Sequence, residues 1–210
     1  CQSRYAWDIA PQDRVRTAEL ARDLGVSRIV AHLLLLRDVS DADAGHRFLT
    51  PSLDQLTDPF VLTGMQAAVD RIHAARQDGE AVQVFGDYDV DGIAGTAILL
   101  EALQRFGIRR VSYGMPSRIT EGYGLGTDHV EAARQANTGL IITVDNGINA
   151  RDAASLAQAL GIDLVVTDHH QLEGALPHAA AIINPKQEAA PYPGRDLAGD
   201  QVVGVGGQER

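Results

Sequence analysis

Seven side chains that could bind metal ions or exchange protons stand in three groups along the chain. Each group follows a short apolar run of the kind that predicts a buried strand. The groups are Asp87, Asp89 and Asp91; Asp145; and Asp168, His169 and His170. Ligands bind beyond the carboxyl ends of the strands in open parallel sheets. We therefore expect the three groups to meet at one edge of a sheet.

Such a cluster favours metal ions, because crowded carboxylates repel one another and are costly to bury unless they are paired or metal-bound. The Asp-x-Asp-x-Asp run at 87–91 alone leaves open a calcium loop or a solvated turn. A calcium loop needs a bidentate Glu further along, and the helix that follows Gly92 has none in that place. Histidine beside carboxylates indicates manganese, with magnesium as a weaker occupant. Two metals bridged by a shared carboxylate would activate water and stabilise phosphoryl charge.

The elements that must position these groups alternate regularly from residue 64 onward. The predicted strands are 81–85, 111–115, 140–144, 162–166 and 180–183, and the predicted helices are 65–76, 93–106, 128–135 and 150–160. Short buried strands that alternate with helices predict an α/β fold, a parallel sheet flanked by helices on both faces.

Residues 1–60 predict a small helical appendage, with helices over 17–25, 27–37 and 41–48 and a break at Pro51 and Pro59. The glycine-rich end of the chain predicts no element. We expect three parts: the appendage at 1–60, the α/β domain at 61–199 and a divergent tail at 200–210.

Composition excludes some classes of protein. The single cysteine, Cys1, excludes an internal disulfide framework and a zinc–thiolate cluster, which suits a reducing compartment. A net charge of −10 argues mildly against a stand-alone nucleic-acid binder, although an acidic metal site also produces such a balance. No apolar run is long enough to span a bilayer and no signal peptide opens the chain, so we expect a soluble, cytoplasmic protein. A start at Cys1 suggests a fragment or a processed product.

Four motifs in order resemble those of the DHH phosphoesterases. Val165-Val166-Thr167 followed by Asp168-His169-His170 is similar to the family's signature. The segment 85–92 resembles the first motif of the RecJ branch, the single-strand-specific 5′ to 3′ exonucleases, and 143–148 resembles its next acidic motif. The segments 115–118 and 121–125 are typical of that branch rather than of the small DHH enzymes. The resemblance runs from about residue 60 to Pro185.

The resemblance implies a role for each of the clustered residues. Asp89 and Asp91 would bind separate metals, Asp145 would bridge them and His169 would bind one. His170 would lie near the scissile phosphate, where it would stabilise charge or assist proton transfer.

Asp87 and Asp168 would orient the ligands by hydrogen bonds; capping of the tight turn is the alternative for Asp87. Arg118 is the candidate phosphate contact, since a guanidinium can bind phosphate in a bidentate way, and a solvated loop arginine is its alternative. Tyr123 could stack on a base or anchor its loop.

The implied function is that of a manganese-dependent exonuclease that degrades single-stranded DNA from the 5′ end in recombination and repair, alongside helicase and single-strand-binding proteins. The chain departs from the family after Leu197-Ala198-Gly199, where residues 200–210 do not predict the expected helix. A further ligand aspartate and a second, DNA-gripping domain are not visible. We therefore expect this chain to be weakly active or inactive. The alternatives are a small phosphodiesterase acting on short oligonucleotides or cyclic dinucleotides, and a non-catalytic binding fragment.

Overall fold

The computed structural model describes residues 11–119, 122–187, 192 and 197–206. The chain forms two compact units, Cys1–Leu56 and Thr57–Arg210. Each unit has its own core and is described by itself.

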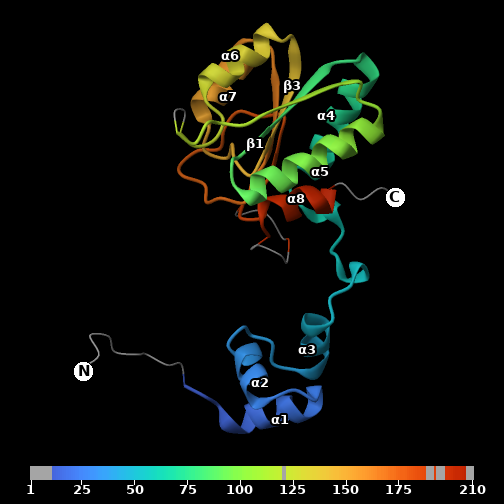
Figure 1. Cartoon of the computed structure of the whole chain (residues 1–210), viewed down its shortest axis with the longest axis vertical. Coiled ribbons are helices and arrows are strands. Elements are labelled where there is room, and N and C mark those ends of the chain that lie inside the picture. The colour runs from blue at the N-terminus through green and yellow to red at the C-terminus, as the bar shows by residue number, and fades with distance from the viewer. Residues whose placement is uncertain (1–10, 120–121, 188–191, 193–196, 207–210) are drawn as a thin grey trace, which may run out of the picture. The chain divides into compact units, whose positions relative to one another are not determined.

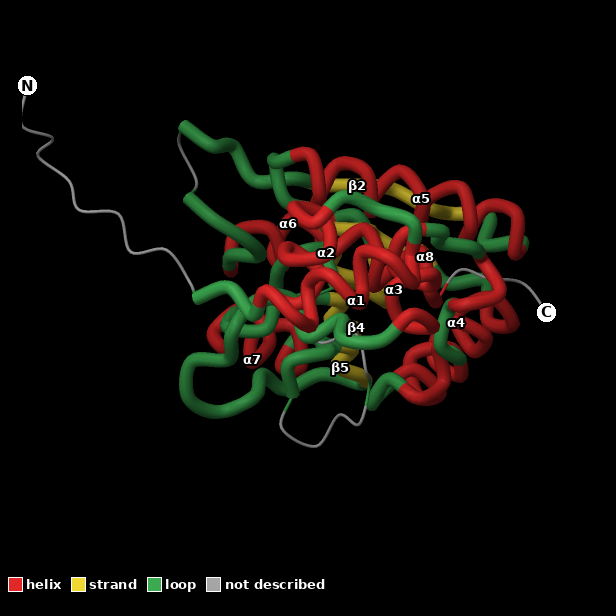
Figure 2. Tube along the Cα trace, turned by 90° about the horizontal axis from the view of Figure 1, so that it is seen from below, coloured by secondary structure: helices red, strands yellow, loops and turns green. Residues whose placement is uncertain are grey.

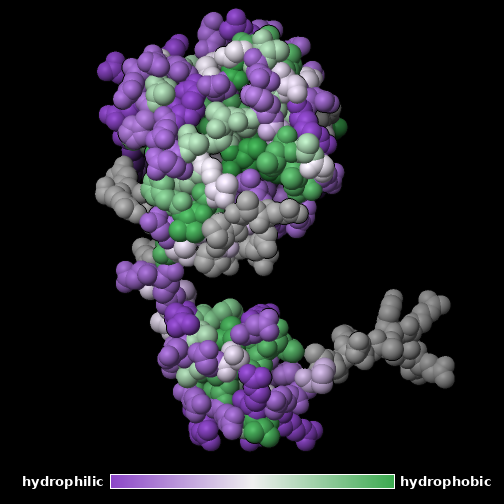
Figure 3. Space-filling model, turned by 180° about the vertical axis from the view of Figure 1, so that it is seen from behind, coloured by the Kyte–Doolittle hydropathy of each residue, from purple (hydrophilic) through white to green (hydrophobic). Residues whose placement is uncertain are grey.

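The N-terminal unit contains the three predicted helices, α1 (Arg14–Leu24), α2 (Arg28–Leu35) and α3 (Ala42–Leu49), and the short 3-10 turn η1 (Leu53–Gln55). Each helix begins at a residue whose side chain accepts a hydrogen bond from the first turn, which satisfies an otherwise unpaired amide. These N-cap residues are Asp13, Ser27 and Asp41. A small core of Leu20, Ala21, Ala31 and Leu34 joins α1 to α2. Apolar side chains also remain exposed among polar ones on this unit (Figure 3).

The C-terminal unit is built on a five-stranded sheet in the order β2-β1-β3-β4-β5, and every neighbouring pair is parallel. The strands are β1 (Ala81–Gly86), β2 (Arg110–Gly114), β3 (Thr138–Val144), β4 (Asp163–Thr167) and β5 (Ala181–Ile183). The other elements are η2 (Pro59–Val61), α4 (Met65–Asp78), α5 (Val90–Phe106), α6 (Thr127–Gln135), α7 (Arg151–Ala159) and α8 (Gly199–Gly206). Figure 2 shows β2 and β5 at opposite edges. The predicted α/β fold is confirmed.

Helices cover both faces of this sheet (Figure 1), and an apolar layer lies between the sheet and the helices on each face. Successive side chains of a strand point to opposite faces, and β3 follows this rule: Leu140, Ile142 and Val144 pack in one layer and Ile141 in the other. The first layer is completed by α4, α5 and α8, and the second by α6 and α7. Both faces of β3 are therefore buried, as its continuous apolar run predicts.

The prediction that residues 200–210 form no helix is wrong for the first part of this segment, since α8 covers Gly199–Gly206. Val202 and Val203 are buried in the α4–α5 layer, so the helix is stabilised by packing rather than by its glycine-rich composition. At Gly95 of α5 a Cβ would lie 3.2 Å from the Cα of Asp200, which is why the two helices can approach closely. Residues 207–210 lie outside the described residues. The domain boundaries at 60 and 199 stay predictions.

None of the helices in the described part of the chain is long and apolar enough to cross a membrane.

At the end of the sheet where the strands begin, Arg71 of α4 joins two acidic residues. Its Nη2 lies 2.6 Å from Oε2 of Glu80, and its Nε lies 2.5 Å from Oδ2 of Asp163 at the start of β4. The Arg71 side chain is mostly buried. Its loss would therefore leave Glu80 partly buried without its partner.

We predict that Arg71→Met lowers the free energy of unfolding by about 2 kcal/mol in urea titrations, because it removes one partner of a partly buried charge cluster. Arg105→Met is the matched control, since Arg105 pairs with Glu101 on an exposed face of α5. That substitution is expected to cost less than about 0.5 kcal/mol. Equal effects of the two substitutions would show that the Arg71 cluster does not stabilise the fold.

Candidate active site

The register of the sheet brings the three predicted groups together. Gly86 of β1 pairs with Val144 of β3, and Val144 pairs with Thr167 of β4. The next residue of each strand is an aspartate: Asp87, Asp145 and Asp168. Three acidic side chains therefore leave the sheet at one level of its carboxyl edge, as expected for an open parallel sheet.

Two groups of possible ligand atoms share one residue. In Asp87, Asp89 and Asp145, one carboxylate oxygen of each residue lies within 4.8 Å of the others. The same limit holds for one ligand atom each of Asp145, His169 and His170. Asp145 thus lies between two sets of donors, which is the place that a bridging ligand would occupy.

Asp91 lies at the same edge but is held differently. Its Oδ2 is 3.6 Å from Nε2 of His169, and its carboxylate accepts hydrogen bonds from the backbone amides of Gly199, at 2.8 Å, and of Asp200. These amides belong to the first turn of α8, where backbone N–H groups have no partner within the helix. The start of α8, where the sequence predicted no helix, therefore orients Asp91, one of the predicted metal ligands.

Asp145 is the most constrained acid of the site. Its residue is only 1% exposed, its backbone is left-handed with φ of 63°, and its Oδ1 lies 3.0 Å from Nε2 of His169. Burial, followed by repulsion from Asp91 and Asp89, raises the pKa of Asp145 to about 8. A cation between these carboxylates would remove both costs, so the donor set fits a divalent metal.

This pKa has a consequence for stability without metal. The folded pKa of Asp145 lies above its unfolded value, so the folded state binds more protons between pH 4 and pH 8. The contribution of this residue is therefore favourable at low pH and is lost as pH rises through about 8.

We predict that the chelator-treated chain loses up to about 2 kcal/mol of unfolding free energy between pH 6 and pH 8 because of Asp145. Asp145→Asn should flatten that part of the profile in urea titrations, since an amide does not ionise. His170, whose hydrogen bond with Asp168 raises its pKa, contributes in the same direction in both proteins. An unchanged slope in Asp145→Asn would contradict the prediction.

Asp168 is a buried acceptor that fixes the neighbouring histidine. Its Oδ1 accepts from the amide of His170 at 3.0 Å and lies 2.7 Å from that residue's Nδ1. Its Oδ2 accepts from the amide of Ile148 at 2.9 Å. Burial alone would raise the pKa of Asp168, but hydrogen bonds from His170 and Ile148 lower it, so the carboxylate is ionised. This arrangement is the one expected of an orienting residue.

Asp87 and Asp89 follow β1, and both carboxylates accept backbone hydrogen bonds in the turn before α5. Asp89, and not Asp87, caps α5, since its Oδ1 accepts from the amide of Gly92 at 3.0 Å. Asp87 is buried, and burial raises the pKa of its carboxyl, while a hydrogen bond from the Tyr88 backbone lowers it. Orientation of the ligands and capping of the tight turn therefore both stay predictions for Asp87. At Gly92 a Cβ would lie 2.6 Å from backbone atoms of Asp87, so this tight turn requires glycine.

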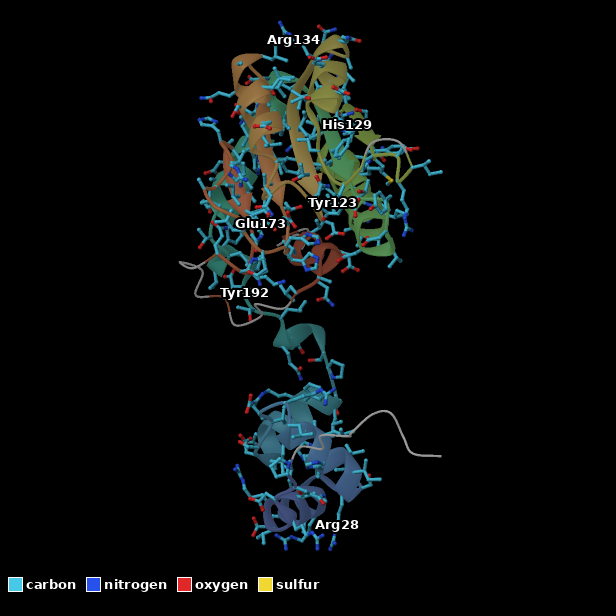
Figure 4. The ribbon with its side chains drawn as sticks, turned by 90° about the vertical axis from the view of Figure 1, so that its left-hand side faces the viewer. Arg28, Tyr123, His129, Arg134, Glu173 and Tyr192 are labelled. Carbon is cyan, nitrogen blue, oxygen red and sulfur yellow. The ribbon has the colours of Figure 1, made fainter. Side chains whose placement is uncertain are left out.

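Arg118 and two tyrosines line the open side of the cluster. The Arg118 guanidinium lies 5.5 Å from the ring centre of Tyr88, and its charge lowers the pKa of Asp87. Tyr123 lies in the loop before α6 (Figure 4). Its hydroxyl donates to the carbonyl of Asp145 at 2.7 Å and lies 3.1 and 3.2 Å from the ring nitrogens of His170. The hydroxyl thus anchors the loop, while the residue stays 53% exposed. Stacking on a base stays a prediction.

Sequence reasoning missed Asn146. Its Nδ2 donates to the carbonyls of Phe85 at 3.1 Å and Val144 at 2.9 Å, and the residue is fully buried. It therefore ties the end of β1 to the end of β3, beside Asp145. His129 is partly buried: its Nδ1 accepts from the amide of Gly126 and its ring packs on Phe85. The contact of Asn146 with Phe85 and the packing of His129 on Phe85 join distant segments, whereas the bond between Gly126 and His129 is local to the start of α6.

Residues 81–204 match the DHH family, N-terminal domain, and the chain belongs to this family. Two similar relatives are each described as single-stranded-DNA-specific exonuclease RecJ. The protein of Bacillus subtilis is 37% identical over an alignment that covers 97% of this chain and 25% of the relative. The protein of Escherichia coli is 40% identical over 69% of this chain and 24% of the relative. The chain thus spans about a quarter of the length of these relatives.

Solved structures agree with this placement. One structure, described as exonuclease RecJ bound to manganese, is 30% identical to this chain with a TM-score of 0.62. The match covers 70% of this chain and 37% of the chain in that structure. A second structure, described as RecJ in complex with Mn²⁺ from Thermus thermophilus, has a TM-score of 0.72. The match covers 95% of this chain and 27% of the chain in that structure. At 24% identity, that second likeness shows the fold alone.

Proposed function

We propose that this chain carries the metal-binding part of a phosphodiester hydrolase that removes nucleotides from the 5′ end of single-stranded DNA. The observation that carries the proposal is the position of Asp145, buried between two sets of possible ligand atoms at the carboxyl edge of the sheet. The similarity to relatives named single-stranded-DNA-specific exonucleases supports the choice of substrate.

Asp89, Asp91, Asp145 and His169 would hold two metal ions, with manganese preferred and magnesium as the weaker alternative. Asp87 lies within the same cluster and could contribute to it. When bound, such ions lower the pKa of water and stabilise the charge that develops on the phosphoryl oxygens. A similar structure described as bound to manganese supports this choice.

The remaining polar residues of the site act on the substrate side. Asp168 holds His170 in one orientation, and the exposed part of the imidazole faces the cluster, where it can stabilise a phosphoryl oxygen or transfer a proton. Arg118 supplies a permanent positive charge near Asp87, which suits a contact to the DNA phosphates. Burial and nearby acids raise the pKa of Tyr123, so its hydroxyl remains a neutral donor.

We infer a cytoplasmic protein of recombination and repair whose partners include single-stranded DNA, a helicase and a single-strand-binding protein. The net charge of −10 does not oppose this assignment, because divalent cations would neutralise part of the acidic cluster.

The proposal is tested with single-stranded DNA labelled at its 5′ end, incubated with the chain and Mn²⁺. We expect slow release of labelled mononucleotide, no attack on blunt duplex, and no release by Asp145→Ala. Faster cleavage of dinucleotides than of long strands would favour the small phosphodiesterase alternative. Manganese-dependent DNA binding without any hydrolysis would instead favour the non-catalytic alternative and contradict the catalytic role of this chain.

A further inference from the structure

A cavity of about 410 Å³ opens beside the metal cluster, by which we mean the predicted ligands Asp89, Asp91, Asp145 and His169. One wall is the loop before α6, residues 123–127, and another is the segment 147–153 at the start of α7. These two helices lie on the same face of the sheet (Figure 1). The volume falls within the range of small-molecule sites, and neither the metal ligands nor Arg118 occupy this cavity.

The cavity is continuous with the candidate active site through three shared residues, Tyr123, Asp168 and His170. Tyr123 also donates to the carbonyl of Asp145, and the ring nitrogen Nδ1 of His170 lies 2.7 Å from Oδ1 of Asp168. A substrate whose phosphate lies at the cluster, beside His170, would therefore have one of its attached groups directed into the cavity. The cavity is placed to hold part of the nucleotide that carries the phosphate.

The lining favours a flat, neutral group over a second phosphate. Its apolar part is formed by the buried side chains of Leu125, Ile148 and Ala153. Of the described residues that line it, Arg151 is the one that is always positively charged, and its Nη1 donates to the backbone carbonyls of Glu173 and Ala175. The lining carboxylate of Asp152 would also repel an anion.

The polar rim offers both kinds of hydrogen-bonding group. α7 begins at Arg151, and its N-cap residue Ala150 makes no side-chain cap. The amides of Ala150 and Arg151 already donate to the carbonyls of Gly147 and Asn149, so the donors of the first turn are the amides of Asp152 and Ala153. The carboxylate of Asp152 adds an acceptor, whereas the side chain of Asn149 is held by the backbone of Gln171 and Glu173. A flat ring that carries both acceptors (ring nitrogens or carbonyls) and a donor (an exocyclic amino group) would match these protein groups. One face of such a ring would pack against the apolar wall.

We propose that this cavity is the subsite for the nucleobase of the nucleotide whose phosphate lies at the metal cluster. The inference rests on the proposed function, because the phosphate position is taken from it. It adds a base-binding site on the α6–α7 side of the sheet, made of backbone amides and apolar side chains rather than of base-specific arginines.

The test compares two probes in the presence of Mn²⁺: deoxyadenosine 5′-monophosphate and deoxyribose 5-phosphate, which lacks the base. We expect the chain to bind the nucleotide at least about tenfold more tightly in equilibrium dialysis, since burying a base against protein groups contributes this much. Thr127→Trp fills the cavity from an exposed position of its lining and should reduce the difference to less than about threefold. Glu131→Trp, on α6 but outside the lining, is the matched control and should keep the difference.

A second measurement locates the base, and one of its three probes, deoxyadenosine, does not depend on the metal site. With Mg²⁺, the nucleotide should shift the methyl resonances of Leu125 and Ile148, whereas deoxyribose 5-phosphate should not. Deoxyadenosine, which has no phosphate, should shift the same methyl groups at higher concentration. Failure of both phosphate probes to bind would overturn the proposed phosphoesterase site. Equal affinity of the two probes, an undiminished difference in Thr127→Trp, or unshifted methyl groups with nucleotide and nucleoside would overturn the base subsite.

Discussion

Asp145→Ala is expected to weaken Mn²⁺ binding by about 100-fold or more and to remove any hydrolysis of single-stranded DNA. The reason is that Asp145 belongs to both groups of possible ligand atoms, so its loss leaves each group with two members. Isothermal titration calorimetry of the purified chain measures both the affinity and the number of ions bound. Normal stoichiometry in the variant would disprove the bridging role.

The variant should nevertheless fold, and this separates loss of the site from loss of the structure. Without metal, Asp145 is a buried carboxyl repelled by Asp91 and Asp89, so its removal relieves an unfavourable interaction. We expect the metal-free variant to be at least as stable as the parent near pH 8 in urea titrations. Asp78→Ala, which removes an exposed acid at the end of α4, is the control and should leave Mn²⁺ binding unchanged.

The part of the site that could be predicted from sequence is the part that directly follows apolar runs. Asp87, Asp145 and Asp168 each come one residue after a strand, and parallel pairing puts equivalent strand ends at one level. Their convergence therefore needed only the strand positions and the parallel order. The roles of Asp89 and Asp91 as separate metal ligands stay predictions.

The rest of the site depends on contacts between distant segments. Asp91 accepts from amides more than a hundred positions away, and the Tyr123 hydroxyl reaches Asp145 from another loop. Asn146 joins the carbonyls of two strand ends that only the register brings together. α8 was missed because three of its eight residues are glycine, a composition that opposes a helix, while its stability comes from burying Val202 and Val203.

Gly199 at the start of α8 is expected to be nearly as important as the ligands themselves. A Cβ at this position would lie 2.7 Å from Oδ1 and 2.9 Å from Cγ of Asp145, a side chain that is buried and cannot move away. We predict that Gly199→Ala lowers the free energy of unfolding by about 2–3 kcal/mol in urea titrations. Mn²⁺ affinity, measured by calorimetry, should fall at least about tenfold, because displacement of α8 removes the amides that hold Asp91.

Gly204→Ala in the same helix provides the control. A Cβ there would meet nothing within 4 Å, and alanine has the better helix propensity. This variant should be more stable than the parent by up to about 1 kcal/mol, with unchanged Mn²⁺ affinity. If Gly199→Ala lowers the free energy of unfolding and Gly204→Ala raises it, α8 acts through its contact with Asp145 and Asp91. If Gly199→Ala behaves like Gly204→Ala, α8 is a packing element with no part in holding the metal ligands.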